Sequence, residues 1–303
     1  MPGDGPQQKL QVGGVCGKDD QVATLHDALI GMIKGLAAYG VAGRRLARPI
    51  RNDTAERFVL QALFATITNA NFDPEALLEM ARQARAMRDR LRQRLATANA
   101  LPSALPQETL FAPAEDTLEG WLAAGRKVGV LANPALEQNV RSLQSVIQIG
   151  LQGLAAYAEH AAVLGYVDDE IVAFVQEALL AITDNALSLD DLLGWVQRTG
   201  EMGVRTMALL DKANTSTYGH PEPTQVNIGV RSGPAILISG HDLRDLYDLL
   251  EQTKGTGVNV YTHGEMLPAN AYPLFKQYDH LVGNYGGSWW RQTDEFARFN
   301  GAI

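Results

Sequence analysis

Two side chains able to bind a metal follow two successive apolar runs near the end of this 303-residue sequence. His241 comes directly after the run 235–238, and Glu265 follows the run 258–261. The step of 24 residues from 241 to 265 fits one strand–helix–strand unit, and such a unit brings the ends of both strands to one rim of a parallel sheet. Because imidazole and carboxylate are good ligands for divalent iron or zinc, we predict a metal site there. The alternative is that both side chains cap helices or face solvent.

Other motifs offer less chemistry. His263, two residues before Glu265, is a lesser candidate ligand. No Gly-x-Gly-x-x-Gly follows the first run, and the sequence contains neither a P-loop nor a Gly-x-Ser-x-Gly motif. Dinucleotide binding, P-loop phosphate binding and α/β-hydrolase chemistry are therefore not predicted.

The elements that must position His241 and Glu265 alternate between strand and helix. Short apolar runs predict buried parallel strands, and apolar residues at helical spacing predict the helices between them. The predicted strands are 235–238, 258–261 and 280–283, and the predicted helices are 242–253 and 268–278. With three strands before Ile303, we expect an incomplete sheet whose open edge binds a partner chain or aggregates.

Helical periodicity dominates the residues before 213. Asp19 or Asp20 is the expected cap of a helix that runs to about Gly40. Further helices are expected at about 54–69, 74–98, 117–127, 134–164, 169–184 and 189–211.

This helical part contains an internal similarity. Residues 30–39 resemble 149–157, and residues 63–87 resemble 179–202, at an offset that stays nearly constant. The pattern predicts a duplicated bundle of about three helices per copy; chance recurrence of common helix residues is the alternative. The predicted copies are about 19–98 and 134–211. The predicted fold is therefore mainly α, two tandem three-helix bundles in 1–213, followed in 214–303 by the start of a Rossmann-like α/β parallel-sheet domain.

Composition narrows the class of protein. A net charge of −8 argues against a broad nucleic-acid surface. The single cysteine, Cys16, excludes a disulfide framework and any thiolate-only metal site built by this chain alone. The sequence shows neither a signal peptide nor a stretch long and apolar enough to span a bilayer. We expect a soluble cytoplasmic protein with no membrane or nucleic-acid partner.

Several blocks together carry a resemblance to a known family. They are GVCGK at 14–18, TITNANFD at 66–73, YGHPEPTQVN at 218–227, LISGHDL at 237–243, TGVNVYTHGEMLPA at 256–269, HLVGNYG at 280–286 and EFARF at 295–299. With them, the sequence from about residue 14 onwards resembles the hybrid cluster protein (prismane) family of hydroxylamine reductases, which is related to carbon monoxide dehydrogenase.

The resemblance implies two metal centres. One is an iron–sulfur cubane that passes electrons and is bound by four cysteines, of which Cys16 matches the last. The other is an iron–sulfur–oxygen hybrid cluster that reduces hydroxylamine or nitric oxide, and His241 and Glu265 match its first His and Glu ligands. The implied oxidoreductase of nitrogen metabolism has no catalytic residues beyond the metal ligands, takes a small nitrogen-containing substrate and needs a redox donor.

This sequence departs from the family pattern in its cysteines. Three cubane cysteines have no counterpart, and residue 10, where one is expected, is Leu. The hybrid-cluster cysteines and a second Glu lie, in the family, beyond residue 303. We therefore expect an incomplete reductase, with another chain supplying the missing C-terminal part. The alternatives are a cluster-free binding or scaffold subunit, or a mononuclear metal protein that uses His241, Glu265 and either His263 or Cys16.

Overall fold

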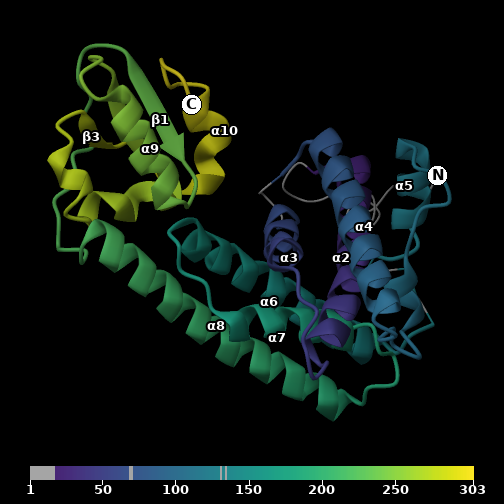
Figure 1. Ribbon diagram of the computed structural model, residues 1–303. Helices are drawn as coiled ribbons and strands as arrows, with labels where there is room; N and C mark the ends of the chain where they lie inside the picture. The colour runs from purple at the N-terminus through teal and green to yellow at the C-terminus, as the bar shows by residue number, and fades with distance from the viewer. Residues whose placement is uncertain (1–17, 68–70, 130–131, 134) are drawn as a thin grey trace, which may run out of the picture. The chain divides into compact units, whose positions relative to one another are not determined.

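The computed structural model describes residues 18–67, 71–129, 132–133 and 135–303 (Figure 1). These residues form two compact units. The helical unit comprises 1–159 and 167–207, and the sheet unit comprises 160–166 and 208–303. The predicted fold class is confirmed, because long helices come first and a small parallel sheet with its own helices follows.

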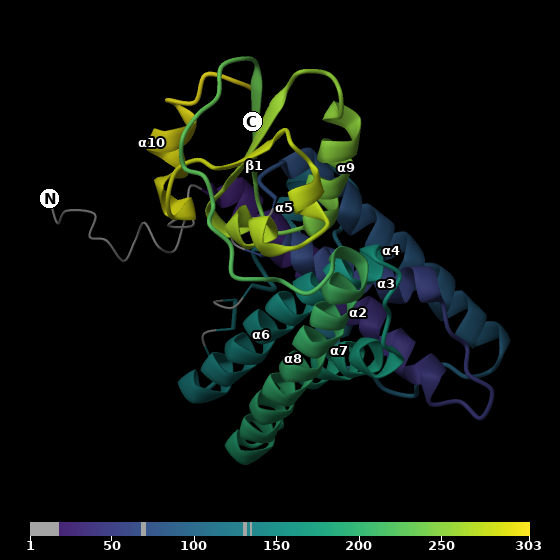
Figure 2. The same ribbon diagram turned by 90° about the vertical axis from the view of Figure 1, so that its left-hand side faces the viewer.

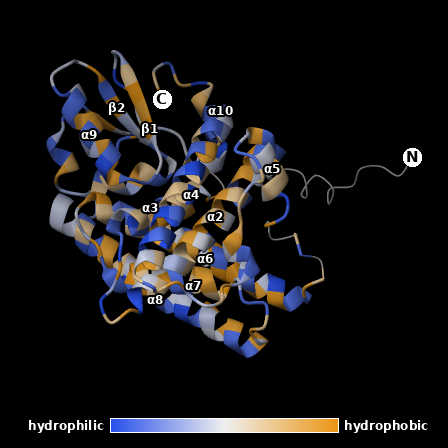
Figure 3. Ribbon diagram, turned by 45° about the vertical axis from the view of Figure 1, so that its right-hand side comes forward, coloured by the Kyte–Doolittle hydropathy of each residue, from blue (hydrophilic) through white to orange (hydrophobic). Residues whose placement is uncertain are grey.

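Helix α2 (Asp20–Arg44) is the centre of the helical unit. It begins where the Asp19 side chain accepts a hydrogen bond from the Val22 amide, which satisfies one of the free N–H groups of the first turn. Most of its residues are buried, since it packs against helices on several sides, and Figure 3 shows hydrophobic colouring along much of its ribbon. Gly35 permits a close approach to the chain around Thr109, because an added Cβ there would lie 2.4 Å from the Thr109 carbonyl oxygen.

Six more helices follow in the order that the periodicity predicts. They are α3 (Asp53–Ala65), α4 (Pro74–Thr97), α5 (Leu118–Gly125), α6 (Gln138–Val163), α7 (Asp169–Ala181) and α8 (Leu189–Tyr218), with a short 3₁₀ helix η1 (Gln107–Leu110) before α5. Asn52, Asp73 and Asp168 cap α3, α4 and α7 through their side chains. The long–short–long order of α2–α4 recurs in α6–α8, with 25, 13 and 24 residues against 26, 13 and 30. This recurrence supports the duplication, which stays a prediction, as do the domain boundaries.

Helix α8 is longer than predicted. The helix continues through the residues after position 211, where the hydroxyl groups of Thr215 and Thr217 bond to the carbonyl oxygens of Asp211 and Ala213 four residues before them and so do not compete for the backbone N–H groups. The helix ends at Gly219, whose φ of +88° is a left-handed conformation that favours glycine.

The sheet has three parallel strands in the order β1-β2-β3. They are β1 (Ala235–Ser239), β2 (Asn259–His263) and β3 (Leu281–Asn284), close to the predicted runs. The carboxyl ends of β1 and β2 are in register, with Ser239 paired to His263.

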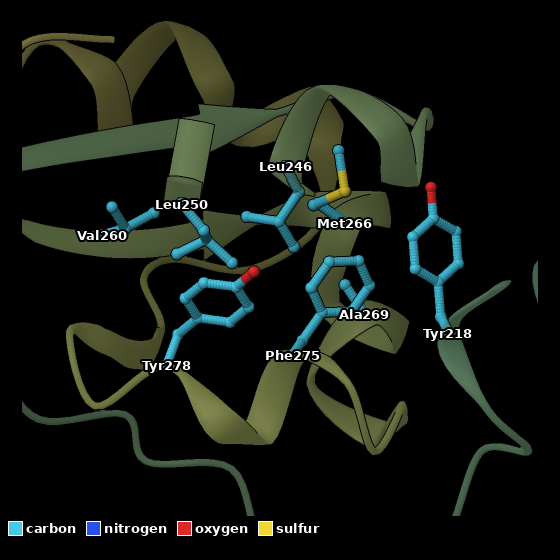
Figure 4. Close-up of a cluster of buried hydrophobic side chains, with 8 residues drawn as sticks. All are labelled: Tyr218, Leu246, Leu250, Val260, Met266, Ala269, Phe275 and Tyr278. Atoms are coloured by element: carbon cyan, nitrogen blue, oxygen red, sulfur yellow. The ribbon is translucent and has the colours of Figure 1, made fainter. Parts of the chain in front are cut away.

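Both faces of the sheet are covered. Helix α9 (Leu243–Thr253) and the short helix α10 (Gln292–Phe296) lie on opposite sides of β1 (Figures 1 and 2). The face under α9 holds the larger cluster, in which Leu246 and Leu250 pack with Val260 and Phe275 (Figure 4). The opposite face holds Leu237, Tyr261 and Val282, with Phe296 and Phe299 packed against them. Neighbouring residues of β2 thus point to different faces, as the pleat of a strand requires.

The predicted helix at 268–278 was wrong. The connection from β2 to β3 contains two 3₁₀ helices instead, η2 (Gly264–Ala271) and η3 (Phe275–Gln277). Pro268 and Pro273 explain the difference, because a proline inside an α-helix removes a backbone donor and clashes with the preceding turn.

Ala302 pairs with the outer edge of β1. It forms a parallel bridge to Ile236, and its carbonyl oxygen accepts a hydrogen bond of 2.9 Å from the Leu237 amide. The order across the sheet is therefore residue 302, β1, β2, β3. The chain first moves from β1 towards β3 and then returns to the other side of β1, so the strand order reverses beside β1.

Candidate metal site at the ends of two strands

The loop after β1 places His241 at the carboxyl end of the sheet. Gly240, with φ of +127°, separates His241 from Ser239, the last residue of the strand. Asp242 then begins α9 by accepting a hydrogen bond of 2.8 Å from the Arg244 amide. In open α/β sheets ligands bind beyond the carboxyl ends of the strands, where the strand order reverses. His241 occupies such a position.

The loop after β2 has the same design. Gly264, with φ of +55°, separates His263 from Glu265, which lies in the first turn of η2. The last residues of the two strands, Ser239 and His263, are paired with each other in the register. Each is followed by one glycine in the left-handed region and then by the predicted ligand.

The structure brings the two predicted ligands together. The Nε2 atom of His241 contacts Oε2 of Glu265. Their side chains remain accessible, with 61% of the His241 and 50% of the Glu265 side-chain surface exposed. An imidazole nitrogen and a carboxylate oxygen that converge on one accessible point can both bind the same small ion.

The pair does not form a complete metal site by itself. Among the residues that the structure describes, no group of three or more His, Cys, Asp and Glu side chains could hold a metal ion. Cys16 lies outside the described residues. The pair fits two ligand positions of one metal ion, whereas a sulfide-bridged cluster needs several thiolates, which a chain with one cysteine cannot supply.

Both ring nitrogens of His263, the lesser candidate ligand, are engaged in hydrogen bonds to other side chains. Its ring is fully buried, with Nδ1 at 3.0 Å from the Ser239 hydroxyl and Nε2 at 2.9 Å from Oε2 of Glu295. The hydrogen bond from His263, together with that from the Gly287 amide, lowers the pKa of Glu295. Both ring nitrogens are therefore in use. Sequence reasoning missed this Ser239–His263–Glu295 chain because nothing in the spacing brings residue 295 next to residue 263.

His160 supports the loop after β1. Its Nδ1 lies 3.3 Å from Oδ2 of Asp242, the residue that follows His241. Burial opposes ionisation of Asp242, but the hydrogen bonds from His160 and the Arg244 amide outweigh it and lower the pKa of the carboxyl.

The TITNANFD block of the resemblance falls in the helical unit. Thr66 accepts hydrogen bonds from the Gln152 amide group through its hydroxyl and its carbonyl oxygen, at 2.9 and 3.1 Å. Asn71 accepts one of 3.2 Å from His26 through its carbonyl oxygen. Residues 68–70 lie outside the described residues.

Comparison with known proteins identifies the family. A sequence profile described as "Prismane/CO dehydrogenase family" matches residues 7–303. The chain belongs to the Prismane/CO dehydrogenase family. The resemblance carried by the sequence blocks is thereby confirmed.

Curated relatives in the Prismane/CO dehydrogenase family carry the name "Hydroxylamine reductase". The relative from Natranaerobius thermophilus is 49% identical over 302 residues, which are 98% of this chain and 53% of that protein. Those from Desulfitobacterium hafniense strain Y51 and Nitratidesulfovibrio vulgaris are each 52% identical and are matched over 96% of this chain and 52% of their own length. This member of the Prismane/CO dehydrogenase family therefore spans about half the length of the curated relatives it matches.

Membrane insertion finds no support among the helices. In the part of the chain that the structure describes, none of them combines the length and the apolar character needed to cross a bilayer.

Proposed function

We propose that this chain forms part of a hydroxylamine reductase-like oxidoreductase, in which His241 and Glu265 bind one iron of an iron–sulfur–oxygen cluster. The observation that carries the proposal is the direct contact between the two side chains at the carboxyl ends of β1 and β2. The names of the half-matched relatives support the reaction class. The substrate class is a small nitrogen compound, hydroxylamine or nitric oxide, and a redox donor supplies the electrons in the cytoplasm.

The chain's own residues have a limited task in this function. His241 donates a neutral imidazole nitrogen and Glu265 a carboxylate, so the pair brings one negative charge to the metal. Bound iron would act as a Lewis acid and electron carrier for the substrate. The half-exposed position of both side chains leaves room for a substrate and for further ligands.

The remaining ligands must come from elsewhere. The match covers about half of the relatives' length, and we propose that a polypeptide segment outside these 303 residues supplies the thiolates and completes the hybrid cluster. Cys16 is the proposed contribution to a cubane cluster. One cysteine is a quarter of the four-cysteine set, so this chain alone is not expected to hold a cubane.

A cluster-free binding or scaffold subunit is the second candidate. The limited donor set favours it, since two converging donors in the described residues and one cysteine in the sequence do not build an iron–sulfur cluster. A mononuclear site that includes His263 has less support, because both nitrogens of that ring are engaged.

Iron and acid-labile sulfide per chain, measured after anaerobic purification together with the oligomeric mass, test the proposal. The chain is prepared alone and with a second polypeptide that covers the unmatched half of the Nitratidesulfovibrio vulgaris relative. We expect little iron alone and several iron and sulfide ions in the complex. His241→Ala and Glu265→Gln should lower the iron content of the complex, whereas His280→Gln, on a histidine at the opposite end of the sheet, should not.

Absence of iron and sulfide from both preparations would contradict the reductase and favour the scaffold subunit. Equal iron content in the complexes of His241→Ala and the unsubstituted chain would contradict the assignment of His241.

A further inference from the structure

A hydrogen-bonded chain of three side chains crosses the sheet unit directly behind the His241–Glu265 pair. Ser239 ends β1, His263 ends β2, and Glu295 lies on α10. Because a carboxylate can only accept, His263 donates from Nε2 to Glu295, and its Nδ1 shares a hydrogen bond with the Ser239 hydroxyl. Every polar atom of the ring is satisfied, although the ring is fully buried.

The surroundings hold this ring in one position. Phe296 meets it edge to face at 5.0 Å between ring centroids. Gly286 packs so closely that an added Cβ would lie 2.8 Å from Cδ2 of His263 and 2.6 Å from Oε2 of Glu295. The Gly287 amide also donates to the Glu295 carboxylate, at 3.1 Å. The buried imidazole therefore connects the ends of β1 and β2 to α10.

The hydrogen-bonded chain joins the residues at which both ligand loops begin. Ser239 and His263 are partners in the strand register, and each stands two residues before a member of the pair. One glycine in the left-handed region, Gly240 or Gly264, lies between the last strand residue and the ligand. Glycine has more backbone freedom than any other residue. Each ligand can therefore change its position relative to the sheet unless the strand residue before the glycine is held in place.

We propose that Ser239, His263 and Glu295 are positioning residues that set the separation and orientation of His241 and Glu265 for binding one metal ion. This inference rests on the proposed function and adds to it the part of the molecule that keeps the two donors convergent. None of the three residues binds the metal. Removing an outer-shell group that bonds directly to a metal ligand typically changes metal affinity about 10- to 100-fold. These three residues act through the backbone of the loops, so we expect the lower end of that range, about 10-fold.

The sheet unit contains a matched control. His280, just before β3, also bonds to a hydroxyl group, with Nε2 at 3.0 Å from Thr253 Oγ1. It lies at the amino end of the strands, away from the pair. Ser239→Ala and Thr253→Ala each delete one hydroxyl bonded to a histidine, and His263→Gln and His280→Gln each replace one bonded ring.

The experiment uses the full chain and Co²⁺ alone as the probe, titrated anaerobically and followed by the visible absorption of the bound ion. We expect Ser239→Ala and His263→Gln to weaken Co²⁺ binding about 10-fold, with Thr253→Ala and His280→Gln within about twofold of the unsubstituted chain. Hydrogen exchange of the amides at 240–242 and 264–266, measured without metal, should be faster in the first two variants than in the controls.

The two readouts separate this inference from the proposed function. If the unsubstituted chain binds no Co²⁺, or if His241→Ala leaves the affinity unchanged, the metal assignment fails, and exchange alone decides whether the chain of bonds orders the loops. If Co²⁺ binds through His241 but Ser239→Ala and His263→Gln bind it as tightly as the controls, the positioning role is overturned. Unchanged hydrogen exchange in both loops overturns it as well.

Discussion

His26 and Asp27 of the helical unit and Glu295 of the sheet unit have pKa values that are shifted by different causes. In the helical unit, burial lowers the pKa of His26 to about 4 and raises that of Asp27 to about 6, so each group is pushed towards its neutral form. In the sheet unit, hydrogen bonds from His263 and the Gly287 amide lower the pKa of Glu295, which favours its charged form. Burial is thus the main cause of the shift at His26 and Asp27, whereas hydrogen-bond donors are the main cause at Glu295.

The largest expected effect tests the sheet side of this comparison. His263→Ala removes a fully buried ring and leaves the Ser239 hydroxyl and the Glu295 carboxylate without their partner. We expect the free energy of unfolding to fall by about 2–4 kcal/mol. Urea denaturation followed by circular dichroism measures it, with His280→Ala as the less buried control. Equal losses of unfolding free energy in the two variants would show that the Ser239–His263–Glu295 hydrogen bonds stabilise the fold no more than those of His280.

The next effect tests the helical side. The pKa of His26 in the folded chain is below its ordinary value. Its contribution to the free energy of unfolding is therefore complete above pH 6.5 and is lost as pH falls towards 4. Asp27 has a folded pKa above its ordinary value of 3.8, so its contribution is complete below that value and is lost as pH rises towards 6. Each shift corresponds to about 3 kcal/mol, and the two oppose each other between pH 4 and 6.

Asp27→Asn should therefore uncover the His26 effect. We expect this variant to lose about 3 kcal/mol of stability between pH 6.5 and 4, and to exceed the unsubstituted chain at pH 7. Urea unfolding across this range measures the slope, and Asp20→Asn, at a half-exposed ion pair with Arg126, serves as the control. A pH profile of Asp27→Asn parallel to that of the unsubstituted chain would mean that burial does not govern Asp27.

A smaller effect distinguishes the two predicted helical copies. Gly35 and Gly153 occupy corresponding positions in the repeated GLAAY segment. An added Cβ at Gly35 would lie 2.4 Å from the Thr109 carbonyl oxygen, whereas at Gly153 no atom of the described residues, apart from its own helix backbone, lies within 4 Å. We expect Gly35→Ala to cost about 1–3 kcal/mol and Gly153→Ala to gain about 0.5–1 kcal/mol. Thermal unfolding of both variants gives the sign, and the same sign in both would refute the difference in packing.

The smallest effect concerns an exposed ion pair of the sheet unit. Arg244 and Asp248 are four residues apart on α9, at 2.9 Å. Arg244→Gln should lower the free energy of unfolding by less than any of the changes above, and the difference should vanish in 1 M salt because exposed pairs are screened. A loss as large as that of Gly35→Ala would mean that this exposed pair stabilises the fold as much as buried packing does.

Periodicity was sufficient to predict most of the fold. Capping residues such as Asp73 and Asp168 mark helix starts by chemistry that is local in sequence, and β1, β2 and β3 form close to their apolar runs. The errors arose where local rules compete. Pro268 prevents an α-helix that the apolar spacing suggests, and α8 continues to Tyr218 through residues that usually form turns.

The candidate site was predictable only in part, for a related reason. His241 and Glu265 are one strand–helix–strand unit apart, so their meeting at one rim follows from the topology of parallel strands. Glu295 reaches His263 only because the chain returns across the sheet after β3. That return depends on tertiary packing, for which no spacing rule exists.

The bridge between Ile236 and Ala302 has a consequence for biosynthesis. The three strands leave the ribosome before Ala302 does, so β1 first exists with one of its edges unpaired. An exposed edge of a short apolar strand can pair with other nascent chains. The interval before Ala302 docks is thus the time at which a newly made chain depends most on chaperones, and the strand at risk is the one that leads into His241.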